Sequence, residues 1–238
     1  MGFPIEIESK TEESVDLREF AVEVGDLGNA GNAGKVDVEV APVELGIGRG
    51  SRWIAVAGGL GYVPVAPGTA GSLGGVLLFV LVATTGAGLS RGNFALLYAL
   101  GVGALLVLGI RAAGRAEVDF GRRDDGRIVI DEVVGQLIAL APLIFLLPSP
   151  STMSAMFAGD DFFQLIPEVV TGFVLFRLFD VWKPGAIRWA ECRFEGGLGV
   201  MADDVVAGLY AGLCLFVCLV VLQMLDSGVS GVVLGVSA

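Results

Sequence analysis

Acidic side chains occur in three short strings of the chain where they could bind a metal ion. The strings are IDEVVGQ at 130–136, FRLFDVWKP at 176–184 and GGLGVMADD at 196–204. Together they supply five carboxylates: Asp131, Glu132, Asp180, Asp203 and Asp204. Carboxylate oxygens are the ligands that Mg²⁺ prefers, and adjacent carboxylates repel each other unless a cation neutralises them. All five are therefore candidate Mg²⁺ ligands, and the first three of them are also candidate catalytic residues.

Basic and hydroxyl side chains near these strings could bind phosphate. Arg177, Asp180 and Lys183 recur every three residues, so a helix would place them on one face. Arg188 continues the cationic side beyond the proline that ends this helix. The string PGTAGS at 67–72 is a Gly-rich turn before an apolar run, and N–H groups at a helix start can hold phosphate. The candidate phosphate ligands are Thr69, Gly71, Ser72, Arg177, Lys183 and Arg188, and Lys183 is also a candidate catalytic residue.

Each string also has a purely structural interpretation. Ser72 could be a helix N-cap, as could one Asp of 203–204. Asp131 and Glu132 would be favourable at a helix start, and Arg177 could pair only with Asp180. Two features favour chemistry. First, a helix cap needs one carboxylate, whereas Asp203 and Asp204 supply two. Second, charges inside a membrane span cost several kcal/mol unless they are paired or functional.

Missing residue types exclude several phosphatase designs. The chain contains no histidine, which excludes a histidine base, a phosphohistidine intermediate and histidine metal ligands. A Cys-x₅-Arg phosphatase is excluded because the sixth residue is Leu198 after Cys192 and Val220 after Cys214. No D-x-D-x-T string is present, so an aspartyl-phosphate enzyme of that kind is also excluded.

The composition indicates a membrane protein. Of 238 residues, 54% are hydrophobic and 17% are charged, against about a quarter charged in soluble domains. Glycine, with 36 residues, is abundant, as is common in membrane helices. The net charge of −11 argues against nucleic acid as a partner, because phosphate backbones need clustered Lys and Arg.

The elements that must position these residues are apolar helices. A spanning helix needs about 20 mostly apolar residues. We expect an all-α, polytopic helical membrane protein with about five membrane-embedded helices. The clear spans are 72–89, 94–114 and 204–225, and the weaker ones are 133–148 and 166–182. The segment 53–66 is short and broken by Gly and Pro, which suits a re-entrant or interfacial position.

Basic residues alternate between the predicted loops. The loops 115–132 and 183–203 contain Arg or Lys, whereas 149–165 and 226–238 contain neither. The positive-inside rule then places the N-terminus and both basic loops in the cytoplasm. All the strings described above would face that side.

The first 50 residues differ from the rest. Residues 1–50 are predicted to form an acidic, mobile cytoplasmic tail, and 51–238 the helical membrane domain. The tail lacks the basic start and apolar core of a signal peptide. A short strand at 36–40 and a small regulatory segment are alternative interpretations of parts of it.

Four segments resemble those of bacterial phosphatidylglycerophosphatase A. They are APGTAGSLGG, IDEVVGQ, FRLFDVWKPGAIRW and GGLGVMADDVVAG, in the family's order and spacing, between about Trp53 and Leu225. The resemblance implies a multi-pass enzyme of the bacterial inner (cytoplasmic) membrane, with its active site facing the cytoplasm. It implies a Mg²⁺-dependent hydrolysis of phosphatidylglycerophosphate to phosphatidylglycerol and inorganic phosphate. None of the family's five acidic positions is lost here.

The expected mechanism is in-line attack by a metal-activated water, without a covalent intermediate. The expected partners are a phospholipid substrate and the membrane; the sequence does not indicate an oligomeric state. One alternative is a CDP-alcohol phosphatidyltransferase-like enzyme, whose motif Asp125 and Gly126 begin but the following residues do not continue. A small membrane transporter is another, although its ionisable groups should lie near the midplane. The last is a structural protein whose carboxylates only cap helices.

Overall fold

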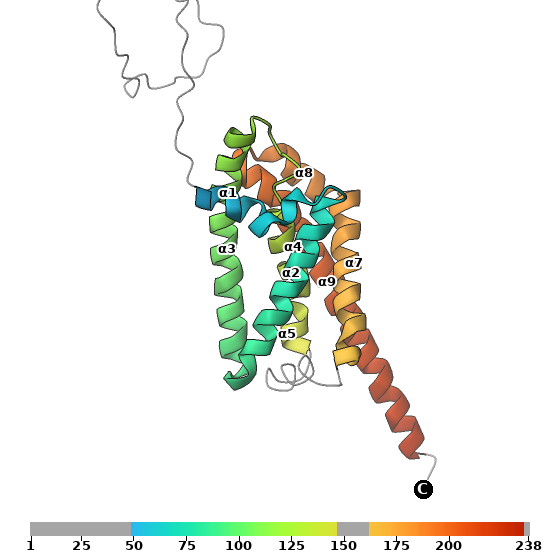
Figure 1. The fold of residues 1–238 in the computed structure, drawn as a ribbon. Coiled ribbons are helices and arrows are strands. Elements are labelled where there is room, and N and C mark those ends of the chain that lie inside the picture. The colour runs from blue at the N-terminus through green and yellow to red at the C-terminus, as the bar shows by residue number, and fades with distance from the viewer. Residues whose placement is uncertain (1–48, 147–161, 236–238) are drawn as a thin grey trace, which may run out of the picture. The chain divides into compact units, whose positions relative to one another are not determined.

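The computed structural model describes residues 49–146 and 162–235, and within these ranges it consists of helices joined by short turns and loops (Figure 1). The helices are α1 (Arg49–Ala55), α2 (Pro67–Thr85), α3 (Arg91–Phe120), α4 (Ile130–Leu140), α5 (Pro142–Leu146), α7 (Phe162–Trp182), α8 (Ala186–Arg193) and α9 (Gly196–Gly235), with 3₁₀ turns η2 (Ala57–Tyr62) and η3 (Gly86–Gly88). No strand occurs in the described ranges, as expected for the all-α class. The strand considered at 36–40, with the rest of the tail up to residue 48, lies outside them.

Three helices are long and apolar enough to cross a membrane. Among the described residues they are Pro67–Thr85, Arg91–Phe120 and Gly196–Leu225. They correspond to the three clear predicted spans. The predicted span 133–148 is instead divided into α4, with 11 residues, and α5, with 5 residues. The break precedes Pro142, whose nitrogen has no hydrogen to donate to the helix.

The helices α2, α3, α4, α7 and α9 run in alternating directions, and α5 continues the direction of α4 (Figure 1). The first residues of α2, α4 and α9 and the last residues of α7 lie at one end of the bundle, beside α1 and α8. These are the helix ends that carry the four strings. The four strings therefore lie at one end of the bundle, and that this end faces the cytoplasm stays a prediction. The five-helix count remains a prediction for α4–α5 and α7.

Helix α4 lies at the centre of the bundle. It packs most extensively against α9 and α2, and also contacts α7 and α3. Nine of its 11 residues are buried. A helix this enclosed cannot shift without moving its neighbours, so it provides a rigid mount for Asp131 and Glu132 at its first turn.

Glycines bring the backbones of these helices into contact. A Cβ on Gly208 of α9 would collide with the carbonyl oxygen of Gly135 on α4, and a Cβ on Gly135 would lie 2.7 Å from the carbonyl oxygen of Asp204. Helix α2 approaches α4 in the same way. A Cβ on Gly71 would lie 2.9 Å from the carbonyl oxygen of Val129, just before α4, and a Cβ on Gly75 would lie 2.9 Å from that of Val133. Small residues permit this close approach in membrane bundles, and a methyl group would force backbones apart.

Two helices begin earlier than the predicted spans. The predicted span 204–225 belongs to α9, which already begins at Gly196. Gly197 packs there against the Ile110 carbonyl of α3, so glycine provides close contact rather than flexibility. Similarly, α2 begins at Pro67, and Ser72 lies inside the helix with its hydroxyl donating to Gly68 O at 2.9 Å. Neither Ser72 nor the 203–204 pair caps a helix.

The α4–α9 contact predicts the effect of adding one methyl group. Gly208→Ala should lower the free energy of unfolding by about 1–3 kcal/mol, because the collision is with backbone that has little room to move. Thermal unfolding in detergent measures this change. Gly103→Ala on α3 is the matched control, since nothing lies within 4 Å of its added Cβ. Equal melting temperatures for the two variants would contradict the close crossing.

Candidate active site

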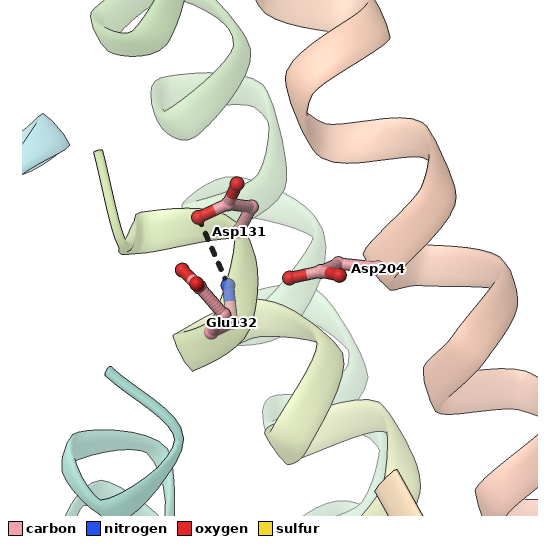
Figure 2. A group of neighbouring side chains, drawn as sticks. All are labelled: Asp131, Glu132 and Asp204. Carbon is pink, nitrogen blue, oxygen red and sulfur yellow. Dashed lines mark hydrogen bonds between the residues drawn. The ribbon is translucent and has the colours of Figure 1, made fainter. Parts of the chain in front are cut away.

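Three carboxylates from two helices converge at the α4–α9 crossing (Figure 2). One oxygen from each of Asp131, Glu132 and Asp204 lies within 4.8 Å of the others. Asp131 and Asp204 are buried, with 7% and 3% of their surfaces exposed. They stand one helical turn before Gly135 and Gly208, so the contact between those glycines sets the spacing of the carboxylates.

The electrostatics of this group favour a bound cation. The Glu132 amide donates to Asp131 Oδ1 at 3.1 Å, while the buried Glu132 Oε2 has no hydrogen-bond partner in the described part of the chain. Within the same residues no ion pair links Lys or Arg to any of the three carboxylates. Closely spaced buried carboxylates resist ionisation unless positive charge is supplied. Three oxygen donors of this kind fit a divalent ion such as Mg²⁺.

An arginine and a fourth carboxylate flank the group. Arg177 Nη1 donates to Asp180 Oδ2 at 2.5 Å and to the Ser72 hydroxyl at 3.3 Å. The Asp180 carboxylate also lies near Asp204. The Cα of Gly68 on α2 faces both the Glu132 carboxylate and the Arg177 guanidinium. The Arg177–Asp180 ion pair exists, but it is continuous with the carboxylate group rather than isolated.

Asp203 faces another set of partners. Lys183 Nζ donates to Asp203 Oδ2 at 2.8 Å and to Glu191 Oε1 at 3.1 Å. Burial lowers the pKa of Lys183, but the hydrogen bonds and charges of the two carboxylates outweigh it and raise the pKa above its ordinary value. The ammonium therefore stays charged. Adjacent residues on a helix point about 100° apart, which is why Asp204 joins the carboxylate group and Asp203 does not.

The remaining candidates are more scattered. Gly71 is buried against α4 and Thr69 is half-buried in the first turn of α2. The Thr69 and Ala70 amides donate to Ala66 O, at 3.0 and 3.2 Å, so neither is free for phosphate. Arg188 is exposed on α8 and lines a polar cavity of about 630 Å³ that also contains Asp203. The structure thus places Arg188 with Asp203 rather than with the three-carboxylate group.

Comparison with known proteins identifies the family. A family model described as Phosphatidylglycerophosphatase A matches residues 53–219. The chain belongs to the phosphatidylglycerophosphatase A family. All the candidate residues of the site lie inside the matched region. The resemblance seen in the sequence is therefore confirmed.

Three curated relatives illustrate the match. Phosphatidylglycerophosphatase A of Escherichia coli (strain K12) is 32% identical over 180 residues, covering 75% of this chain and 90% of that protein. Its counterpart in Haemophilus influenzae is 35% identical over 170 residues, covering 68% and 85%. A Bacteroides thetaiotaomicron protein provisionally named phosphatidylinositol-3-phosphatase is 37% identical over 178 residues, covering 71% and 88%. No solved structure matches the chain.

One buried polar residue of the IDEVVGQ segment is not among the candidates that the sequence suggests. Gln136 is completely buried, and neither polar atom of its side-chain amide has a hydrogen-bond partner among the described residues. The available signal is its position, four residues after Glu132 in an otherwise apolar helix. A buried glutamine needs a polar partner. That Gln136 has none among the described residues is visible only once α2 is packed against α4.

The Lys183 ion pairs predict a pH-independent contribution to stability. Lys183→Met should lower the free energy of unfolding by about 1–2 kcal/mol, because two charge-assisted hydrogen bonds are lost from a partly exposed site. A raised folded-state pKa gives stability that is fully present below the unfolded pKa of about 10.4 and is lost as pH rises through the folded value. Melting temperatures of both proteins between pH 6 and 9 should therefore differ by a constant amount. A difference that shrinks across this range would contradict the assignment.

Proposed function

We propose that the chain is a Mg²⁺-dependent phosphatase that hydrolyses phosphatidylglycerophosphate to phosphatidylglycerol and inorganic phosphate. The observation that carries the proposal is the convergence of Asp131, Glu132 and Asp204 within 4.8 Å, with Arg177 beside them. The names of the Escherichia coli and Haemophilus influenzae relatives supply the reaction. The carboxylates and the arginine supply groups that a phosphate-handling site needs.

The donor set fits magnesium. Asp131, Glu132 and Asp204 would hold the ion. The buried Glu132 Oε2, which has no hydrogen-bond partner among the described residues, would be paired by this cation. When bound, Mg²⁺ supplies charge neutralisation for phosphate oxygens and lowers the pKa of a water, which makes it a nucleophile. Asp180 would complete the ligand set or hold a proton of that water, because it borders both Asp204 and Arg177.

Arg177 is preorganised to bind the phosphate. Its guanidinium is held by Asp180 and by the Ser72 hydroxyl, and only 22% of its side chain is exposed. Fixed donors that neutralise the transferring phosphoryl group lower the barrier without reorganisation. Gly68 has no side chain, so α2 approaches Arg177 and Glu132 closely: a Cβ there would collide with Glu132 Oε1 and lie 3.4 Å from Arg177 Nη1. Lys183, fixed between Asp203 and Glu191, would instead position α8 against α9.

Aromatic residues support a lipid substrate. Trp53 in α1, Tyr62 in η2, Trp182 at the end of α7 and Trp189 in α8 are 60%, 49%, 69% and 61% exposed. Their elements lie at the same end of the bundle as the carboxylates. Trp and Tyr favour the boundary between membrane and water. A site at that level would meet the head group of a lipid.

The residue that begins the partial CDP-alcohol phosphatidyltransferase motif has a structural partner. Asp125, which begins the partial D-G string, accepts two hydrogen bonds from the Arg127 side chain, at 2.6 and 2.9 Å. This hydrogen bonding holds the pKa of Asp125 below its ordinary value. The Arg127 guanidinium also stacks over the Phe120 ring at 3.8 Å. Asp125 therefore serves to fold the loop after α3.

Phosphate release tests the proposed reaction. Purified protein in detergent should release phosphate from phosphatidylglycerophosphate with Mg²⁺ and not with EDTA. Asp204→Asn should lower turnover by at least about 100-fold, whereas the neighbouring Asp203→Asn should keep Mg²⁺-dependent turnover and lose only stability. Equal losses in both variants would refute the different roles of the two residues. Release from phosphatidylinositol 3-phosphate alone would move the substrate toward that of the Bacteroides relative.

The orientation in the membrane follows from the basic residues. We propose five membrane-embedded helices, with α4–α5 and α7 completing the set, and the site end in the cytoplasm. Cys192 on α8 is exposed and is the only cysteine outside α9. After serine replaces the two cysteines of α9, an impermeant maleimide should label Cys192 in inside-out vesicles but not in intact spheroplasts. Gly88→Cys at the opposite end is the control, and labelling of Cys192 from outside would reverse the topology.

A further inference from the structure

The unpartnered amide of Gln136 lies one helical turn from the carboxylate group. Gln136 and Glu132 are four residues apart on α4, so their side chains lie on one face of the helix. Both have a buried polar atom without a hydrogen-bond partner among the described residues: the Gln136 amide and Glu132 Oε2. Buried polar groups in native proteins are nearly always paired, so two orphans on one helix face require an explanation.

Helix α2 restricts the groups that Gln136 can reach. A Cβ on Gly75 would lie 2.8 Å from the Cβ of Gln136, and a Cβ on Gly71 would lie 3.2 Å from that of Glu132. The glycine face of α2 thus covers both side chains and provides no polar side chain at Gly75. The hydroxyl of Ser72, also on α2, donates to Gly68 O and accepts from Arg177. Glu132 is the orphaned partner on the same face.

We infer that Gln136 is a positioning residue that donates a hydrogen bond from Nε2 to the Glu132 carboxylate when that carboxylate binds the cation. The bond fixes the direction of the Glu132 side chain from one side, as Asp131 fixes the Glu132 backbone through the 3.1 Å amide contact. This inference rests on the proposed Mg²⁺ site. Outer hydrogen bonds of this kind commonly change metal affinity by about 10–100-fold.

The test replaces the amide by an apolar side chain of similar size. Gln136→Leu and Gln136→Met should weaken Mn²⁺ binding, measured by the EPR signal of free Mn²⁺ in detergent, by about 10–100-fold. In EDTA, both variants should melt at the same temperature as the parent protein or higher, because an unpaired buried amide has been removed. A purely structural role for Gln136 would give the reverse pattern, with lower melting temperatures and unchanged Mn²⁺ affinity.

A double-mutant cycle tests whether Gln136 acts on the metal site through Glu132. In a Glu132→Gln background, Gln136→Leu should have no further effect on Mn²⁺ affinity, because the bond it removes no longer exists. Additive effects, or Mn²⁺ affinity within about twofold of the parent in both Gln136 variants, would overturn the inference. Asp204→Asn is measured alongside. If neither Asp204→Asn nor the Gln136 variants weaken Mn²⁺ binding, the metal site of the proposed function is wrong. If Asp204→Asn abolishes Mn²⁺ binding and the Gln136 variants do not weaken it, only the role of Gln136 is wrong.

Discussion

The backbone contact between α4 and α9 at Gly135 and Gly208 is the constraint on which the rest of the site depends. Without side chains at these two positions the helices meet closely, and one turn earlier Asp131 and Asp204 are brought together in a buried setting. Three carboxylates so placed are unfavourable as anions and favourable as ligands. The packing that makes the bundle tight is therefore also what creates an electrostatic demand for a cation.

Helices α2 and α7 flank the three carboxylates. Helix α2 presents glycine to α4, which leaves Glu132 covered but not crowded, and α7 brings Arg177 and its carboxylate partner to the edge. The arginine is anchored before any phosphate arrives, so little of its freedom remains to be lost on binding. Exposed aromatic residues belong to α1, η2, α7 and α8, which lie at the same end, so the proposed site would lie where a lipid head group meets water.

The sequence is most informative where charge is rare. Carboxylates and arginines stand out in an apolar chain, so residue types and spacing alone predict the four strings, their common side and the helical class. They do not decide whether Asp203 or Asp204 joins the group, because neighbouring residues point in different directions and only the packing of α9 separates them. The start of α9 is the main error. The predicted span begins at 204, whereas Gly197 already lies in the helix and allows a close approach to α3. Gln136 escapes notice as a functional candidate because its lack of partners is a property of packing.

The central claim is that the carboxylates of α4 and α9 share one cation. Iron-directed cleavage tests it most directly: Fe²⁺ replaces Mg²⁺ in the detergent-solubilised protein, ascorbate and peroxide generate radicals at the ion, and mass spectrometry locates the cuts. The account predicts two main cuts, next to Asp131–Glu132 and next to Asp204, both suppressed by excess Mg²⁺. Cleavage confined to the neighbourhood of Glu191 and Arg188, in the cavity beside Asp203, would contradict it.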